Sequence, residues 1–152
     1  MSNGLPTLDL YRLLTRLKKS EGFRARPYRD TEGVWTIGYG WNLDSVPMPE
    51  SIAEAMLHYQ AVSAVADLDE RLPWWRDLDP VRQSVLADMA FNMGIGDAEH
   101  GLLSFRNTLL AIKAGRYAEA AEGMRASKWA RQVKGRAERL ARMMETGQEA
   151  IE

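Results

Sequence analysis

The fold is decided by the stretch from residue 20 to residue 41, which reads Ser-Glu-Gly-Phe-Arg-Ala-Arg-Pro-Tyr-Arg-Asp-Thr-Glu-Gly-Val-Trp-Thr-Ile-Gly-Tyr-Gly-Trp. It holds two carboxylates, Glu21 and Asp30, nine positions apart, and a hydroxyl, Thr36, six positions further on. Turn-forming residues occupy positions 30–33. Polar side chains in a loop rich in glycine and aromatic residues indicate a functional site held on a small scaffold.

The same stretch resembles the phage-type (T4-like) lysozymes and endolysins of glycoside hydrolase family 24. The family pattern of Glu, eight residues, Asp, five residues and Thr is met by Glu21, Asp30 and Thr36, within matching Glu-Gly, Tyr-x-Asp-x-x-Gly and Thr-Ile-Gly-x-Gly frames. A second match lies downstream, with Ser-Lys-Trp at 127–129, Arg-Ala-x-Arg at 136–139 and a late Thr-Gly. The resemblance therefore covers most of the chain.

The two carboxylates suit the cleavage of a glycosidic bond, in which one carboxyl group stays protonated and the other stays ionised. Glu21 ends a helical pattern just before Gly22, where the negative end of the helix dipole disfavours a second negative charge. This small effect points to Glu21 as the general acid, whereas an arginine partner, which the resemblance implies at Arg136, would favour its ionised form instead. Asp30 lies in a turn beside Arg29, where ionisation is easier. Taken singly, Glu21 is better explained as a surface charge at a helix end and Asp30 as an Asx-turn residue, but the motif around them favours catalysis.

The resemblance also implies residues that bind the substrate. Asn92 stands at a family glutamine position and can hydrogen-bond the glycan or cap the end of its helix. Arg136 resembles the arginine that pairs with the catalytic Glu across the cleft, and Lys128 belongs to the Ser-Lys-Trp match. Trp41 replaces a histidine found in many members, so the histidine ion pair is absent, and this ring can stack on a sugar. Trp129 is better explained as a core residue than as a sugar platform.

The pattern predicts an α+β, mainly α, lysozyme-like fold as a single domain over 1–152. A helix over about 7–21, capped by Thr7, leads into a small antiparallel sheet lobe at about 20–48. Prolines bound a long connecting helix at about 49–71, and a helical lobe follows at about 74–152 with the N-terminal helix added to it. Apolar residues nearly all round the helix at 81–93 predict that it is buried. The resemblance places the active cleft between the lobes.

Composition restricts the kind of site. The 152-residue chain has no cysteine and only two histidines, so neither a metal site nor a cofactor is expected. No apolar run approaches the roughly 20 residues that cross a bilayer, and no signal peptide is visible. We therefore expect that the protein does not insert stably into a membrane and that it accumulates in the host cytoplasm until lysis.

Residues 124–142 carry seven bases and one acid, which is typical either of a solvated helix face or of a surface that binds a polyanion. The expected polyanion is bacterial peptidoglycan rather than nucleic acid.

The resulting hypothesis is a monomeric endolysin, a muramidase that hydrolyses the β-1,4 bond between N-acetylmuramic acid and N-acetylglucosamine. Thr36 would hold the attacking water with Asp30, which predicts inversion at the anomeric carbon. A holin-type pore would give the enzyme access to the wall. The alternatives are a lytic transglycosylase, which needs only one acidic residue, and a catalytically weak peptidoglycan-binding or tail-associated module on the same scaffold.

Overall fold

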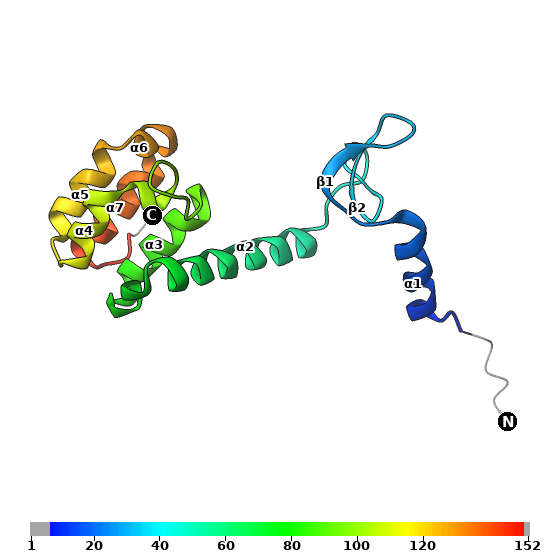
Figure 1. Cartoon of the computed structure of the whole chain (residues 1–152), viewed down its shortest axis with the longest axis horizontal. Helices are drawn as coiled ribbons and strands as arrows, with labels where there is room; N and C mark the ends of the chain where they lie inside the picture. The colour runs from blue at the N-terminus through cyan, green and yellow to red at the C-terminus, as the bar shows by residue number, and fades with distance from the viewer. Residues whose placement is uncertain (1–6, 151–152) are drawn as a thin grey trace, which may run out of the picture. The chain divides into compact units, whose positions relative to one another are not determined.

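The computed structural model describes residues 7–150. Within these residues the protein is mainly helical, with seven α-helices and one three-stranded antiparallel sheet, so the predicted α+β class is confirmed. The chain forms two compact units, of which the first ends at Ala53 and the second begins at Glu54 (Figure 1). The grouping of the N-terminal helix with the helical lobe in one domain stays a prediction.

The first unit contains a helix and the sheet, in the order α1 (Leu10–Glu21), β1 (Arg24–Arg29), β2 (Trp35–Gly38) and β3 (Trp41–Asn42). The predicted cap of the helix at Thr7 is wrong, because the carboxylate of Asp9 accepts the backbone N–H of Arg12 at 3.0 Å. A carboxylate at this position also suits the positive end of the helix dipole. The helix therefore begins at Leu10, later than expected.

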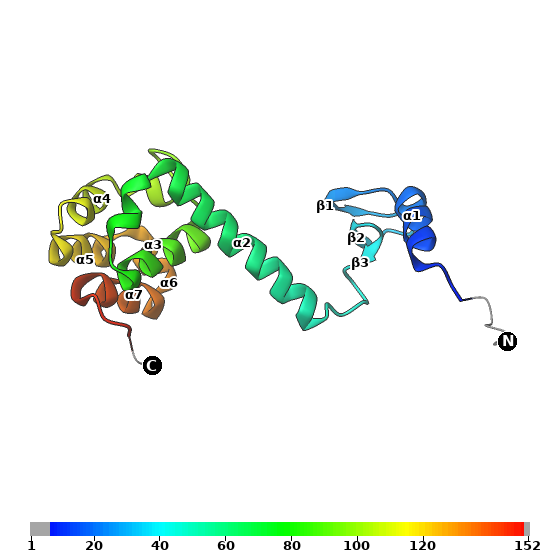
Figure 2. The same cartoon turned by 90° about the horizontal axis from the view of Figure 1, so that it is seen from below.

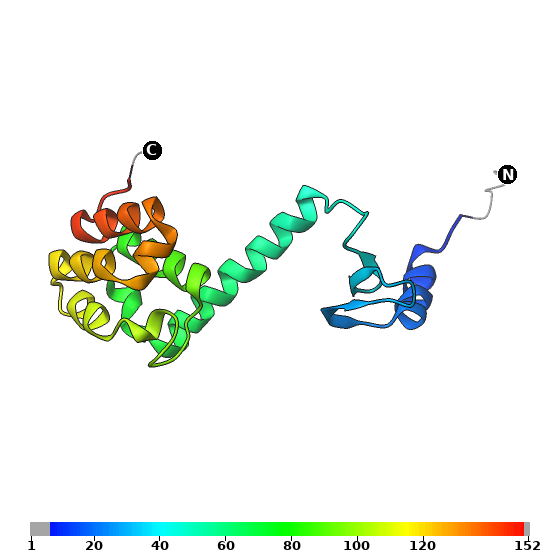
Figure 3. The ribbon, with the colours of Figure 1, turned by 90° about the horizontal axis from the view of Figure 1, so that it is seen from above.

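The strands pair in the order β1-β2-β3, and all neighbours are antiparallel. Tyr28 lies opposite Thr36, and Thr36 in turn lies opposite Asn42. The register of β1 is irregular between Arg24 and Tyr28, the segment that contains Pro27 and has no partner on its outer edge. Figure 2 and Figure 3 show α1 leading directly into β1, at one end of the hairpin that β1 and β2 form. The sheet thus holds the Asp30 turn at the opposite end of β1.

The second unit is helical, and its core is formed by α3 and the helices around it. The second unit begins within α2 (Glu50–Arg71), at Glu54. It continues with the 3-10 helix η1 (Pro73–Asp77), α3 (Pro80–Met93), the 3-10 helix η2 (Leu102–Ser104), α4 (Arg106–Lys113), α5 (Tyr117–Ala126), α6 (Lys128–Val133) and α7 (Gly135–Thr146). Val85, Leu86 and Met89 of α3 are fully buried, so the predicted burial of this helix is confirmed. Figure 1 shows α5 and α7 side by side, and these two helices pack most extensively on each other.

The exposed carboxylate of Asp69, near the end of α2, binds two side chains of η1 by hydrogen bonds. Asp69 accepts hydrogen bonds from Nε of Arg76 at 2.7 Å and from Nε1 of the buried Trp75 at 2.8 Å. The bond from Arg76, followed by the bond from Trp75, lowers the pKa of Asp69 to about 2. A carboxylate whose pKa is lower in the folded state stabilises the fold above its unfolded pKa of about 3.9, and this contribution disappears as the pH falls through the folded value.

We therefore predict that Asp69→Asn lowers the melting temperature most above about pH 5, and that the difference from wild type shrinks toward about pH 2. Thermal unfolding followed by circular dichroism across this range checks it. The exposed Glu70, next to it on α2, provides the control variant Glu70→Gln, which should show no such trend. An equal difference in melting temperature at both ends of the range would exclude a charge-dependent role for Asp69.

Candidate active site

Glu21 is the last residue of α1, and its side chain lies against the turn between β2 and β3. Gly22 ends the helix with a φ of 69°, and its backbone N–H donates to Lys18. The carboxyl group of Glu21 reaches Gly40, where a Cβ atom would lie only 2.6 Å from Oε2. A residue at the end of a helix is thus brought to a turn that follows 19 positions later in the sequence.

Asp30 is fixed by one of its two carboxylate oxygens. Oδ1 accepts the backbone N–H of Glu32 at 2.8 Å and that of Val34 at 2.9 Å, which is the Asx-turn arrangement. Within residues 7–150, Oδ2 has no hydrogen-bond partner. The turn therefore holds the carboxylate in place and leaves its second oxygen available to accept a proton or a water.

Thr36 is linked to Asp30 through Val34. Its hydroxyl donates to the carbonyl of Val34 at 3.1 Å, and its side chain is buried, with 4% of the residue exposed. Val34 also donates its N–H to Asp30 and accepts the N–H of Asp30 at its carbonyl. Because the Thr36 hydroxyl uses its one proton on this carbonyl, its oxygen can only accept a further hydrogen bond. Both side chains thus present acceptors.

Glu21, Asp30 and Thr36 all belong to the first unit, as does Trp41. Trp41 opens β3 directly after Gly40, lies opposite Ile37, and is half-buried. Its stacking on a sugar stays a prediction. Gly40, which contacts Glu21, has a φ of 77°, and the chain continues from it directly into β3.

In the second unit, Asn92 and Trp129 are bonded to each other. Nε1 of Trp129 donates to Oδ1 of Asn92 at 2.8 Å. The Trp129 ring packs edge-on against the ring of Phe105, and the two ring centres lie 6.2 Å apart. Trp129 is 6% exposed, which confirms that it is a core residue. Asn92 is exposed, and this bond uses only the oxygen of its amide.

Arg136 is bound to Asp88. Its Nε donates a hydrogen bond to Oδ1 of Asp88 at 2.8 Å, and a terminal nitrogen lies 2.6 Å from the same oxygen, so an ion pair joins α7 to α3. This pair is partly exposed, so it holds the guanidinium in place at little cost in desolvation. Pairing of Arg136 with Glu21, which the resemblance implies, stays a prediction.

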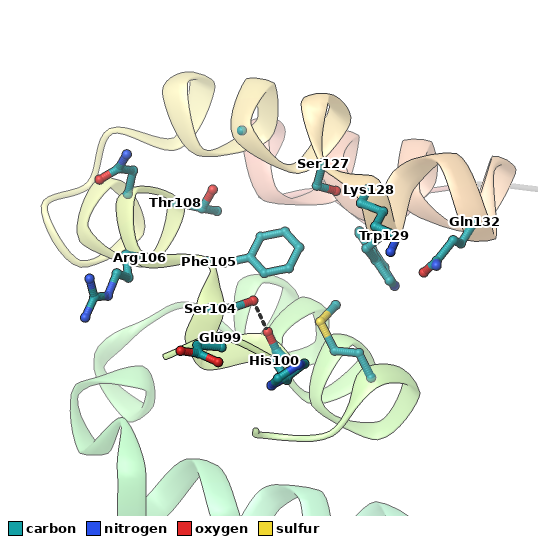
Figure 4. Close-up of a pocket in the computed structure, with 14 residues that line it drawn as sticks. Glu99, His100, Ser104, Phe105, Arg106, Thr108, Ser127, Lys128, Trp129 and Gln132 are labelled. Carbon is teal, nitrogen blue, oxygen red and sulfur yellow. Dashed lines mark hydrogen bonds between the residues drawn. The ribbon is translucent and has the colours of Figure 1, made fainter. Parts of the chain in front are cut away.

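A groove of about 900 Å³ lies entirely within the second unit (Figure 4). Phe105 and Trp129 lie along it, and charged side chains come from both sides, Glu99 and Arg106 on one and Lys128 on the other. Of the predicted binding residues, Lys128 lines this groove, whereas Asn92 and Arg136 do not. Glu99 and Arg106 were not predicted to line a groove, although the glycine-rich loop that precedes η2 is the kind of exposed segment that often carries binding residues.

Two further findings concern other kinds of site. In residues 7–150 no three histidine, aspartate or glutamate side chains gather in a way that would hold a metal ion. None of the helices in the same residues has both the length and the apolar character that crossing a membrane requires.

Comparison with known proteins shows where the chain has relatives. The sequence profile of the phage lysozyme family matches residues 18–145. The chain is 30% identical to the pre-baseplate central spike protein Gp5 of Enterobacteria phage T4, over 86% of this chain and 27% of that protein. It is 28% identical to the probable T4-type lysozyme 1 of Dictyostelium discoideum, over 86% of this chain and 92% of the relative. It is 32% identical to the peptidoglycan hydrolase gp36 of Pseudomonas phage phiKMV, over 94% of this chain and 16% of the hydrolase. The chain thus spans less than a third of either phage protein.

Proposed function

Since this chain belongs to the phage lysozyme family, we propose that it hydrolyses the β-1,4 bond between N-acetylmuramic acid and N-acetylglucosamine in bacterial peptidoglycan. The observation that carries the proposal is the arrangement of the first unit, in which Asp30 keeps one oxygen available and is linked through Val34 to the Thr36 hydroxyl. Glu21 completes the set at the end of α1.

In the proposed reaction, Glu21 donates its proton to the glycosidic oxygen as the bond to the anomeric carbon breaks. A water molecule attacks that carbon from the other face and loses a proton to Oδ2 of Asp30. Both Asp30 and Thr36 present acceptors, so a water between them directs its two protons toward the protein and a lone pair toward the sugar. One water is consumed, and the proton on Asp30 returns to Glu21 through solvent.

This arrangement favours inversion of the anomeric centre. A retaining enzyme needs its second carboxylate about 5–5.5 Å from the acid so that it can attack the sugar, whereas an inverting enzyme leaves about 6.5–9.5 Å for a water. A carboxylate fixed by two backbone N–H groups can orient a water, and Thr36 has a part in the reaction itself, beyond its bond to Val34, only if a water is present.

The groove beside Lys128 and the amide of Asn92 would bind parts of the wall polymer away from the reacting bond. We place the enzyme in the host cytoplasm until lysis, with access to the wall through a holin-type pore. A tail-associated role is the second candidate, because the relative from phage T4 is named a central spike protein.

The test is a turbidity assay on bacteria stripped of their outer membrane, followed by mass spectrometry of the soluble products. Hydrolysis gives fragments with a reducing N-acetylmuramic acid end. Anhydromuramic ends would instead identify a lytic transglycosylase, and the absence of both clearing and soluble products would leave a binding module.

The basic stretch at 124–142 contributes fewer free charges than its composition indicates. Arg125 joins α5 to α7 through Glu138 at 3.0 Å and Glu145 at 3.2 Å, and its hydrogen bonds lower the pKa of Glu138. Arg131 and Lys134 are exposed and line one small pocket together, so they are the better candidates for contact with an anionic wall polymer.

We predict that activity on whole walls falls as salt rises, because the Debye length shrinks from about 10 Å at 0.1 M to about 3 Å at 1 M. The double variant Arg131→Gln, Lys134→Gln should flatten this dependence, whereas Arg125→Gln should not, since Arg125 is already neutralised. Initial rates on purified walls across a salt series check it. A salt profile unchanged in the double variant would make these charges a solvated face only.

A further inference from the structure

The turn at Tyr39 and Gly40 holds the end of α1 by three contacts. The rings of Phe23 and Tyr39 lie 5.5 Å apart in a tilted arrangement. Nζ of Lys18 lies 6.0 Å from the centre of the Tyr39 ring. The carboxyl group of Glu21 lies against Gly40. Residues before and after Glu21 thus contact the same tyrosine.

These contacts matter because α1 has little else to fix it within the first unit. None of its residues, Leu10–Glu21, is buried. Its covalent link to the sheet is Gly22, a glycine with a positive φ, followed by Phe23. Within the first unit, a helix that buries no side chain and leads into a glycine is oriented by its local contacts.

We propose that the Tyr39–Gly40 turn is the positioning element for the Glu21 carboxyl group. Tyr39 holds the helix end by its ring, and Gly40 provides a surface without a Cβ atom on which the carboxyl group lies. The inference rests on the proposed role of Glu21 as general acid. Tyr39 and Gly40 touch no substrate in this proposal, so they are positioning residues. The turn determines where the acid stands relative to the Asp30 hairpin.

Gly40 and Gly38 form a matched pair that separates this role from ordinary turn geometry. Both have a positive φ, 77° and 67°, so an alanine is strained at either position. At Gly38 a Cβ atom would have no neighbour within 4 Å, whereas at Gly40 it would lie 2.6 Å from Oε2 and 3.1 Å from Cδ of Glu21. The group that must move is the end of a flexible side chain, so Gly40→Ala displaces the carboxyl group without a further loss of the fold.

The experiment compares Gly40→Ala with Gly38→Ala in the full chain. The two variants should have similar melting temperatures. The kcat of Gly40→Ala should be at least about tenfold lower than that of Gly38→Ala, with little difference in KM, because a misplacement of about 1 Å costs up to about 10²-fold. Equal kcat values in the two variants would overturn the proposal.

The carboxyl carbon signal of Glu21 provides a readout that is independent of catalysis. It is monitored by NMR during a pH titration. Its chemical shift should change in Gly40→Ala and stay as in wild type in Gly38→Ala. If the wild-type protein releases no product from peptidoglycan, the proposed function is wrong, and this signal alone decides the positioning. An unchanged signal in Gly40→Ala would then overturn it.

Substitutions at Tyr39 test the same turn if Gly40→Ala does not fold. Tyr39→Phe keeps the ring against Phe23 and Lys18 and should retain wild-type kcat, whereas Tyr39→Leu removes the ring and should lower kcat and shift the Glu21 signal. Tyr11→Leu, at a position on α1 that is 80% exposed, controls for the loss of a surface tyrosine and should change neither. A Tyr39→Leu variant with wild-type kcat and an unchanged signal would contradict the proposal.

Discussion

Replacing Glu21 with glutamine is expected to leave a folded protein whose release of muropeptides is lower by about 10²–10⁴-fold, the usual contribution of general acid catalysis. The amide has nearly the shape of the carboxyl group, so it can lie against Gly40 in the same way. It cannot supply an acidic proton to the leaving oxygen. Initial rates on purified peptidoglycan, with a melting curve to verify folding, check this.

The control for Glu21→Gln is Glu32→Gln. Glu32 is an exposed carboxylate of the same unit, and its backbone N–H, which the substitution leaves unchanged, is the group that bonds Asp30. This variant should keep wild-type activity. A Glu21→Gln variant that cleaves at nearly the wild-type rate would remove Glu21 from the role of acid.

The second large effect is expected for Asp30→Asn. The amide oxygen of asparagine can still accept the N–H groups of Glu32 and Val34, so the turn should persist. The other position becomes an NH₂ group, which donates and cannot take a proton from water. We expect a loss of about 10²–10⁴-fold in kcat with a small change in KM, because substrate binding keeps its contacts.

Asp44→Asn is the matched control for Asp30→Asn. Asp44 also fixes the hairpin by accepting a backbone N–H, from Trp35 at 3.2 Å, but the proposed reaction gives it no part. The control separates the loss of a base from a general weakening of the hairpin. If Asp30→Asn retained most of its activity, a reaction with a single carboxylate, such as lytic transglycosylation, would be the better explanation.

The parts of the fold that were predictable from sequence are those encoded locally. The long helix between prolines, expected over about 49–71, is α2 at Glu50–Arg71, since proline stops and starts helices by its own geometry. The burial of α3 followed from apolar residues nearly all round the helix. The predicted start of α1, with Thr7 as its cap, was wrong. Thr7 and Asp9 are both residue types that cap helices well, and sequence alone does not rank two candidate caps so close together.

The parts that were not predictable depend on contacts between residues far apart in the sequence. The sequence did not indicate that Gly40 lies next to Glu21. A glycine at this position is already expected for a turn, where the φ is positive, so it gives no sign of a contact with a distant residue. The sequence groups Arg125 with a basic stretch, because its partner Glu145 lies 20 positions away. The Asp88–Arg136 pair spans 48 positions and is equally invisible to local reasoning.

The most direct measurement is early-time proton NMR of the anomeric signals released from soluble, uncrosslinked peptidoglycan strands by the wild-type protein. If Asp30 and Thr36 hold an attacking water, the β-linkage gives the α-anomer first, and the β-anomer grows in only by mutarotation. A β-anomer that appears first would mean retention, and would make Asp30 a nucleophile instead of the residue that holds the water.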